Sequence, residues 1–90
     1  MLIIEKLNLK EKMSDGEESI AAFILTLGKE LHKYSTRNIA EATLTSPATV
    51  IRLCKKLDFK GFDDFKEQFL KEMNYLDQQY GKVDANFPFN

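Results

Sequence analysis

The chain has 90 residues, which is enough for one domain and lies near the lower limit for an independent hydrophobic core. Apolar residues make up 43% of the sequence and charged residues 30%, a balance that excludes a disordered chain and indicates a globular domain. The net charge of −1 argues against indiscriminate nucleic-acid binding, because proteins of that kind are basic overall.

Cysteine and histidine are too rare for several kinds of site. Cys54, the single cysteine, excludes an intramolecular disulfide and a cysteine-rich zinc site, and it favours a reducing, cytoplasmic setting. His32, the single histidine, has no second metal-ligating residue nearby, so we expect no metal and no bound cofactor. The apolar residues 1–4 are too few for a signal peptide, and no stretch is long enough to span a membrane.

Two helices are predicted in the first third of the chain. Residues 2–8 indicate a short helix. Ser14 and Glu17 have capping-box spacing, in which the serine hydroxyl accepts the Glu17 amide and the glutamate reaches back to the Ser14 amide. A helix is therefore predicted from about Asp15 to Leu27, and Gly28 permits a break after it.

Residues 39–62 predict two helices joined by a tight turn. The first begins after a cap at Ser35 or Thr36 and ends near Thr43. The second is predicted from about Pro47 to Leu57, because Ser46 can cap it and proline suits the first helical position. A short helix, a turn and a second helix with a basic exposed side are the layout of a DNA-binding helix-turn-helix.

A last helix should begin near Phe62 and run to about Tyr80, since large apolar residues recur along it at helical spacing. Residues 81–90 have no helical period and are expected to form an extended tail. The fold class is therefore all-α, a compact bundle of about five helices over residues 1–80. The predicted core consists of Ile20, Ile24, Leu27, Leu31, Ile39, Val50, Leu53, Leu57, Phe59, Phe62, Phe65 and Phe69.

Basic residues gather in the second helix of the motif. Between Thr43 and Gly61 the chain has four basic residues and one acid, whereas most acidic residues lie near the start and in the last helix. A locally basic helix on a near-neutral body suits selective docking better than bulk adhesion. The candidate DNA contacts are Thr36, Arg37, Ser46, Thr49, Arg52, Lys55, Lys56 and Lys60. The plainer alternatives are a solvated helix face for the basic residues and helix capping for Thr36 and Ser46.

Three motifs in order resemble the N-terminal DNA-binding domain of RpiR-type bacterial transcriptional regulators. A Ser-x-x-Glu-x-x-Ile-Ala opening lies at residues 14–21, and a Ser-x-x-Thr-(Val/Ile)-x-Arg core lies at residues 46–52. A Lys-x-Leu-Gly-Phe-x-Gly-Phe junction follows at residues 55–62, with Asp58 in place of its first glycine. The resemblance covers roughly residues 14–72, so it includes most of the chain.

The resemblance implies more than the residues do by themselves. It places Ser46, Thr49, Arg52 and Lys56 at or near double-stranded DNA. It also implies a regulator of sugar metabolism, in which a larger sugar-isomerase-type (SIS) domain binds a phosphosugar effector. That domain is absent from these 90 residues, and residues 81–90 resemble the connector that leads into it.

Three positions depart from the family pattern. Asp58 stands where a glycine is expected in a left-handed conformation, which aspartate tolerates better than most residues. Leu44 stands where helix-turn-helix turns commonly have glycine, and Leu has a steric cost at positive φ. Thr45 replaces an apolar residue. These departures predict an unusual turn between the two motif helices.

Apolar residues at the two ends of the chain bear on its oligomeric state and on an alternative function. Met73, Leu76 and Tyr80, together with Leu2, Ile3 and Leu7, could pack against a second copy, and a homodimer would suit paired half-sites on DNA. The rival interpretation is a protein-interaction bundle that retains the helix-turn-helix shape. Its support is the acidic net charge, the irregular turn expected at Leu44 and Thr45, and the apolar ends. We predict no enzyme activity, because the sequence has no phosphate-binding glycine loop and no pattern of a catalytic triad.

Overall fold

The computed structural model describes residues 1–81. Within them the chain forms five α-helices and one 3-10 helix, in agreement with the predicted all-α class. The elements are α1 (Ile3–Asn8), α2 (Asp15–Leu27), η1 (Gly28–Lys33), α3 (Thr36–Thr43), α4 (Pro47–Lys56) and α5 (Phe62–Tyr80). Only Gly81 of the predicted tail lies within the described residues, where it follows the last turn of α5.

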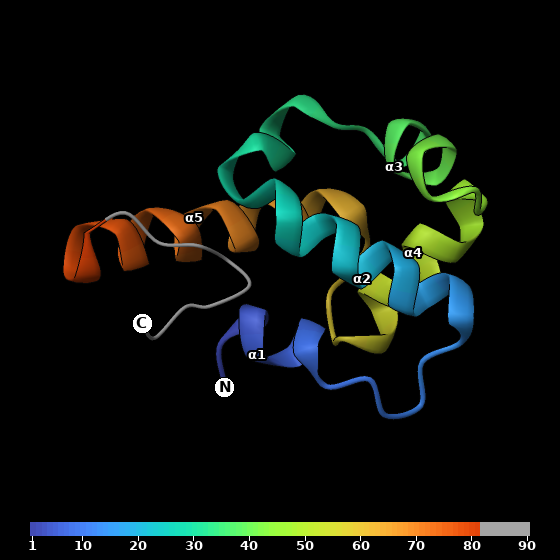
Figure 1. Cartoon of the computed structure of the whole chain (residues 1–90), viewed down its shortest axis with the longest axis horizontal. Coiled ribbons are helices and arrows are strands. Elements are labelled where there is room, and N and C mark those ends of the chain that lie inside the picture. Colours follow the sequence, from blue (N-terminus) through green and yellow to red (C-terminus); the bar gives the residue numbers. More distant parts are fainter. Residues whose placement is uncertain (82–90) are drawn as a thin grey trace.

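The helices are arranged around one hydrophobic core. Figure 1 shows α3 and α4 together at one end of the molecule, α2 through the middle, and the C-terminal half of α5 extending from the other end. Residues Ile20, Ile24, Leu31, Ile39, Val50, Leu53, Phe62, Phe65 and Phe69 are buried as predicted. The other three predicted core residues, Leu27, Leu57 and Phe59, are partly buried and pack against the same cluster.

The short helix α1 is part of this core. The Glu72 carboxylate of α5 accepts hydrogen bonds from the backbone amides of Ile3 and Ile4, at 2.7 and 3.0 Å, so the first turn of α1 is fixed against α5. Ile3, Ile4 and Leu7 are buried. The predicted use of Ile3 and Leu7 as a surface for a second copy is therefore wrong.

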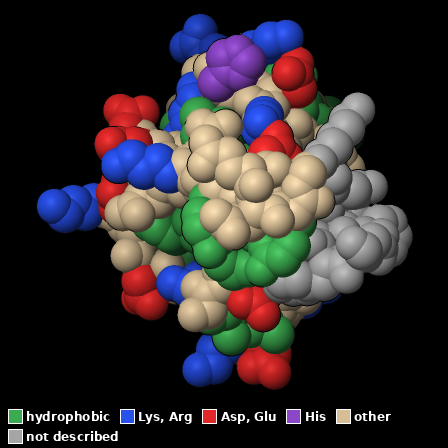
Figure 2. Space-filling view, turned by 90° about the vertical axis from the view of Figure 1, so that its left-hand side faces the viewer, with side chains coloured by type: hydrophobic (Ala, Val, Ile, Leu, Met, Phe, Trp, Pro, Cys, Tyr) green, Lys and Arg blue, Asp and Glu red, His purple; other side chains and the backbone are tan. Residues whose placement is uncertain are grey.

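The same correction applies to the end of α5. Met73 and Leu76 are buried in the core cluster, whereas Tyr80 is exposed. The sequence pattern identified the apolar stripe of α5 correctly, but it could not show that the chain itself covers most of that stripe. Figure 2 views this end of the molecule and shows acidic and basic side chains interspersed around a small hydrophobic area.

Each helix of the helix-turn-helix ends on a left-handed residue that is not glycine. Leu44 follows α3 with φ 56° and ψ 40°, and the Thr45 amide donates to the Ala40 carbonyl at 2.9 Å. Asp58 follows α4 with φ 74°, and the Phe59 amide donates to the Cys54 carbonyl at 3.0 Å. Both endings have the Schellman hydrogen-bond pattern, in which glycine is usual at the left-handed position.

Candidate nucleic-acid interface

Helix α4 has one buried side and one exposed side. Ser46 caps it by accepting the Thr49 amide at 3.2 Å, and Pro47 occupies its first turn, as predicted. Val50, Leu53 and Cys54 point into the core. The opposite side is the α4 outer face, which consists of the exposed residues Ala48, Ile51, Arg52 and Lys55.

Four candidate DNA-contacting cations lack a salt bridge within residues 1–81, although the Lys60 backbone amide and, less strongly, the Lys60 charge lower the pKa of the Asp64 carboxyl. The side chains of Arg37, Arg52, Lys55 and Lys60 form no hydrogen bond or salt bridge there. All four residues are exposed. Four other lysines of the described chain have an acidic partner, among them Lys33, which lies 2.7 Å from Glu30, and Lys71, which lies 3.4 Å from Glu67. Unpaired cations are free to meet phosphate oxygens or the guanine edge.

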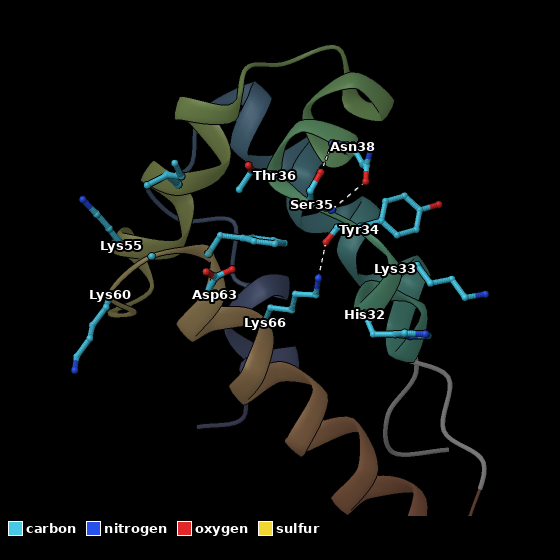
Figure 3. Close-up of a pocket in the computed structure, with 13 residues that line it drawn as sticks. His32, Lys33, Tyr34, Ser35, Thr36, Asn38, Lys55, Lys60, Asp63 and Lys66 are labelled. Atoms are coloured by element: carbon cyan, nitrogen blue, oxygen red, sulfur yellow. Dashed lines mark hydrogen bonds between the residues drawn. The ribbon is translucent and has the colours of Figure 1, made fainter.

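A groove of about 630 Å³ brings three of the predicted residues together. Thr36 at the start of α3, Lys55 on α4 and Lys60 before α5 all line it. In Figure 3, Lys55 and Lys60 lie at one end of the groove and Thr36 lies above it. The N-terminus of α3, where Ser35 caps the Asn38 amide, adds the positive end of its dipole to this basic region.

Two lining residues were missed at the sequence level. Ile51, on the α4 outer face, is 37% exposed, although isoleucine usually indicates a core position. Its spacing of four residues from Lys55 places the two on the same face of the helix and could have identified it. Lys66 donates to the Tyr34 carbonyl at 2.7 Å and lies over the Phe62 ring, so it connects α5 to the segment before α3.

In the free domain, the candidate DNA contacts Ser46 and Thr49 have a structural role, because both take part in the N-terminal cap of α4. Ser46 Oγ lies 2.9 Å from Thr49 Oγ1, and Thr49 is partly buried. A Cβ atom at Gly16 would lie 3.6 Å from the Thr49 methyl group, so the start of α2 approaches the start of α4 closely. Thr36 is the first residue of α3, and Ser35 provides the cap for that helix through the Asn38 amide at 3.1 Å.

Lys56 is placed differently from the other candidate cations. Its ammonium lies 2.7 Å from Glu17 Oε1 and 2.6 Å from the Lys12 carbonyl oxygen. Glu17 is only 1% exposed, and its Oε2 atom has no hydrogen-bond partner among the described residues. Lys56 therefore neutralises a buried carboxylate and fixes α4 to the start of α2.

The pKa of Glu17 reflects competing effects. Burial is the largest and would raise it, but hydrogen bonds from Lys56 and Ser14 and the Lys56 charge together bring the pKa below its usual value. Glu17 is also the residue of the predicted capping box, because its Oε1 accepts the Ser14 amide at 2.8 Å. One carboxylate thus caps α2 and pairs with α4.

The remaining candidate groups have simple environments. Cys54 is buried, as predicted, and burial raises the pKa of its thiol to about 12. His32 is exposed and lies 2.8 Å, through Nδ1, from the Lys29 carbonyl. Residues 1–81 contain no group of histidine, cysteine and acidic side chains that could hold a metal ion. Nor does any helix among them have the length and apolar character that crossing a membrane requires.

The fold and the α4 outer face define a helix-turn-helix domain. The sequence profile of the helix-turn-helix domain of the rpiR family matches residues 1–75. The chain therefore belongs to this family, as the sequence motifs had indicated. DNA binding in a transcriptional regulator is the activity that this membership implies.

Curated relatives agree with this assignment. An uncharacterized HTH-type transcriptional regulator of Bacillus subtilis, YbbH, is 36% identical over 59 residues, which are 66% of this chain and 21% of that protein. An uncharacterized HTH-type transcriptional regulator of Haemophilus influenzae is 31% identical over 72 residues, 80% of this chain and 25% of that protein. The chain thus spans about a fifth to a quarter of their lengths. No solved structure gives a significant match.

Proposed function

We propose that this domain reads a specific sequence in double-stranded DNA with α4 in the major groove. The observation that carries the proposal is the α4 outer face, where Arg52 and Lys55 are exposed and unpaired on a well-capped helix. Arg37 and Lys60 flank this helix with two further exposed cations that form no salt bridge within residues 1–81. A duplex can satisfy all four through phosphates and base edges.

The residues have different roles in this proposal. Arg52 reads a guanine, because its planar fork matches the two acceptors on the guanine edge. Lys55 and Lys60 contact phosphates beside the groove that they line. Thr36 and Arg37, at the start of α3, contact the same backbone.

Three further residues act at the start and end of α4. Ser46 caps the helix through the Thr49 amide, and the adjacent hydroxyls of Ser46 and Thr49 can still be presented to a phosphate. We propose a positioning role for Lys56 in place of a direct DNA contact, because its ammonium already has two acceptors at hydrogen-bond distance.

The larger protein that we propose around this domain is a bacterial, cytoplasmic transcriptional regulator of sugar metabolism that binds DNA as a homodimer. Both curated relatives are bacterial and are four to five times longer than their matched segments. Such a length leaves room for a C-terminal phosphosugar-binding domain, the effector domain that the family resemblance implies. Two copies would place two α4 helices on paired half-sites.

A protein-interaction bundle is the competing function. Part of its support from the sequence was the apolar ends of the chain, but Ile3, Leu7, Met73 and Leu76 are buried within the domain. The exposed Leu44 and the net charge of −1 still favour it. Salt dependence separates the two functions, because binding through several phosphates weakens steeply with salt and an apolar protein interface does not.

The experiment is selection from a random duplex library with the purified domain, sequencing of the retained duplexes, and Arg52→Ala in parallel. We expect a recovered motif, on which Arg52→Ala costs about 1–3 kcal/mol of binding free energy and relaxes one base pair. Tyr75→Ala, at an exposed position on α5, is the control and should bind like the wild type. Failure to enrich any sequence at low salt would favour the interaction bundle.

A further inference from the structure

The α4 outer face contains an apolar part that the proposed contacts to guanine and phosphate leave unused. Ile51 is the one large hydrophobic residue of α4 that is exposed, and Ala48, one turn earlier, is exposed beside it. The other exposed large hydrophobic residues in residues 1–81 are outside α4: Met1, Leu9, Leu44, Tyr75 and Tyr80.

The fold covers part of the Ile51 side chain, which is 37% exposed, but it leaves this residue outside the core cluster. The core side of α4 is filled by Val50, Leu53 and Cys54, each of which is at most 1% exposed. Ile51 lies instead at the wall of the basic groove with Thr36 and Lys55, and next to Arg52 in the sequence. Isoleucine also has a lower helix propensity than arginine, lysine, glutamine or glutamate, so helix formation does not favour it over these polar residues here.

The chemistry of the major groove supplies a partner for such a side chain. Each base pair presents donors and acceptors there, and the C5-methyl group of thymine is the apolar group among them. We propose that Ile51, together with Ala48, contacts a thymine methyl group at a base pair adjacent to the one read by Arg52. This inference rests on the proposed DNA-binding function and adds a base to what α4 reads.

The charged surroundings favour DNA over a protein as the occupant. The centre of a protein–protein interface is depleted in charged residues and rich in contiguous apolar area. Ile51 is instead bordered by the unpaired cations of Arg52 and Lys55 on its own helix. An apolar side chain beside two cations is complementary to the major groove of DNA, where thymine methyl groups lie near negatively charged phosphates.

The test replaces thymine by deoxyuridine, which removes only the methyl group, at each thymine of the selected duplex in turn. For the wild-type domain we expect one replacement to weaken binding about fourfold, the change that corresponds to one buried methyl group at ~0.8 kcal/mol. Ile51→Ser should bind the thymine and deoxyuridine duplexes equally well. Tyr75→Ala, a large exposed residue far along the chain on α5, should keep the wild-type preference.

The other possible outcomes show whether the role of Ile51 or the proposed DNA-binding function is wrong. If the wild type selects a motif but no deoxyuridine replacement matters, or if Ile51→Ser keeps the preference for thymine, the role of Ile51 is wrong and the proposed function stands. If no motif is selected, both fail. Circular dichroism of Ile51→Ser shows that a lost preference does not come from unfolding, and this exposed position should leave the thermal transition nearly unchanged.

Discussion

Lys55 and Lys56 are neighbours of the same residue type on the same helix, but the fold gives them opposite roles. Lys55 extends from the α4 outer face and forms no salt bridge within residues 1–81. Lys56 is turned about 100° around the helix and reaches the buried carboxylate of Glu17. The comparison shows that one lysine of a basic helix can fix the helix in the domain while its neighbour stays exposed and available for a ligand.

The largest effect should come from Lys56→Met, which leaves Glu17 charged, buried and without its cationic partner. We expect a loss of about 2–3 kcal/mol in the free energy of unfolding. Lys55→Met is the matched control and should change that free energy by less than about 0.5 kcal/mol. Urea unfolding of the three proteins measures both, and equal losses for the two variants would remove the distinction between the lysines.

The pH dependence of stability tests the same ion pair from its acidic partner. Folding lowers the pKa of Glu17 below its usual 4.5, so the folded state binds fewer protons than the unfolded state as the pH falls through this range. The stability from Glu17 is therefore present above about pH 4.5 and is lost below it. We expect Glu17→Gln to reduce the fall in the urea midpoint between pH 6 and pH 4, and an unchanged fall would contradict the role of Glu17.

The helix ends on the two sides of α4 offer a smaller effect. Leu44 is 93% exposed at positive φ, where a residue with a Cβ has a steric cost and Leu gains no burial to offset it. Leu44→Gly should raise the thermal midpoint, with a gain of about 1 kcal/mol. Asp58→Gly should gain less, because aspartate tolerates the left-handed region. A destabilised Leu44→Gly would show that the Leu side chain has a contact we have not identified.

Local patterns predicted the helices well because the signals that start and stop them lie within a few residues. The Ser14–Glu17 capping box, the Ser46 cap and Pro47 define helix starts that the structure confirms. Asp58 was expected to be left-handed, and it is. The prediction of an unusual turn after α3 is wrong, because Leu44 itself adopts the left-handed conformation and the helix ends with the ordinary Schellman hydrogen bonds. The apolar periodicity of α5 likewise identified its buried stripe.

Contacts between distant segments were beyond the sequence patterns. Glu17 and Lys56 are separated by 39 positions, and nothing local to either residue indicates the pair. The same holds for Glu72, which fixes the first turn of α1 across 69 positions and so helps bury Ile3. A charge pattern cannot say which lysine of a basic helix is already paired. The assignment of the eight candidate DNA contacts therefore stays a prediction.

The most direct measurement is the affinity for the selected duplex as a function of salt, for the wild type, Lys55→Met and Lys56→Met, at a temperature where all three are folded. We expect the slope of log K against log salt to decrease by about 1 for Lys55→Met, because one phosphate contact is lost. Lys56→Met should keep the wild-type slope. A reduced slope for Lys56→Met with an unchanged slope for Lys55→Met would contradict the proposed division of charges on α4.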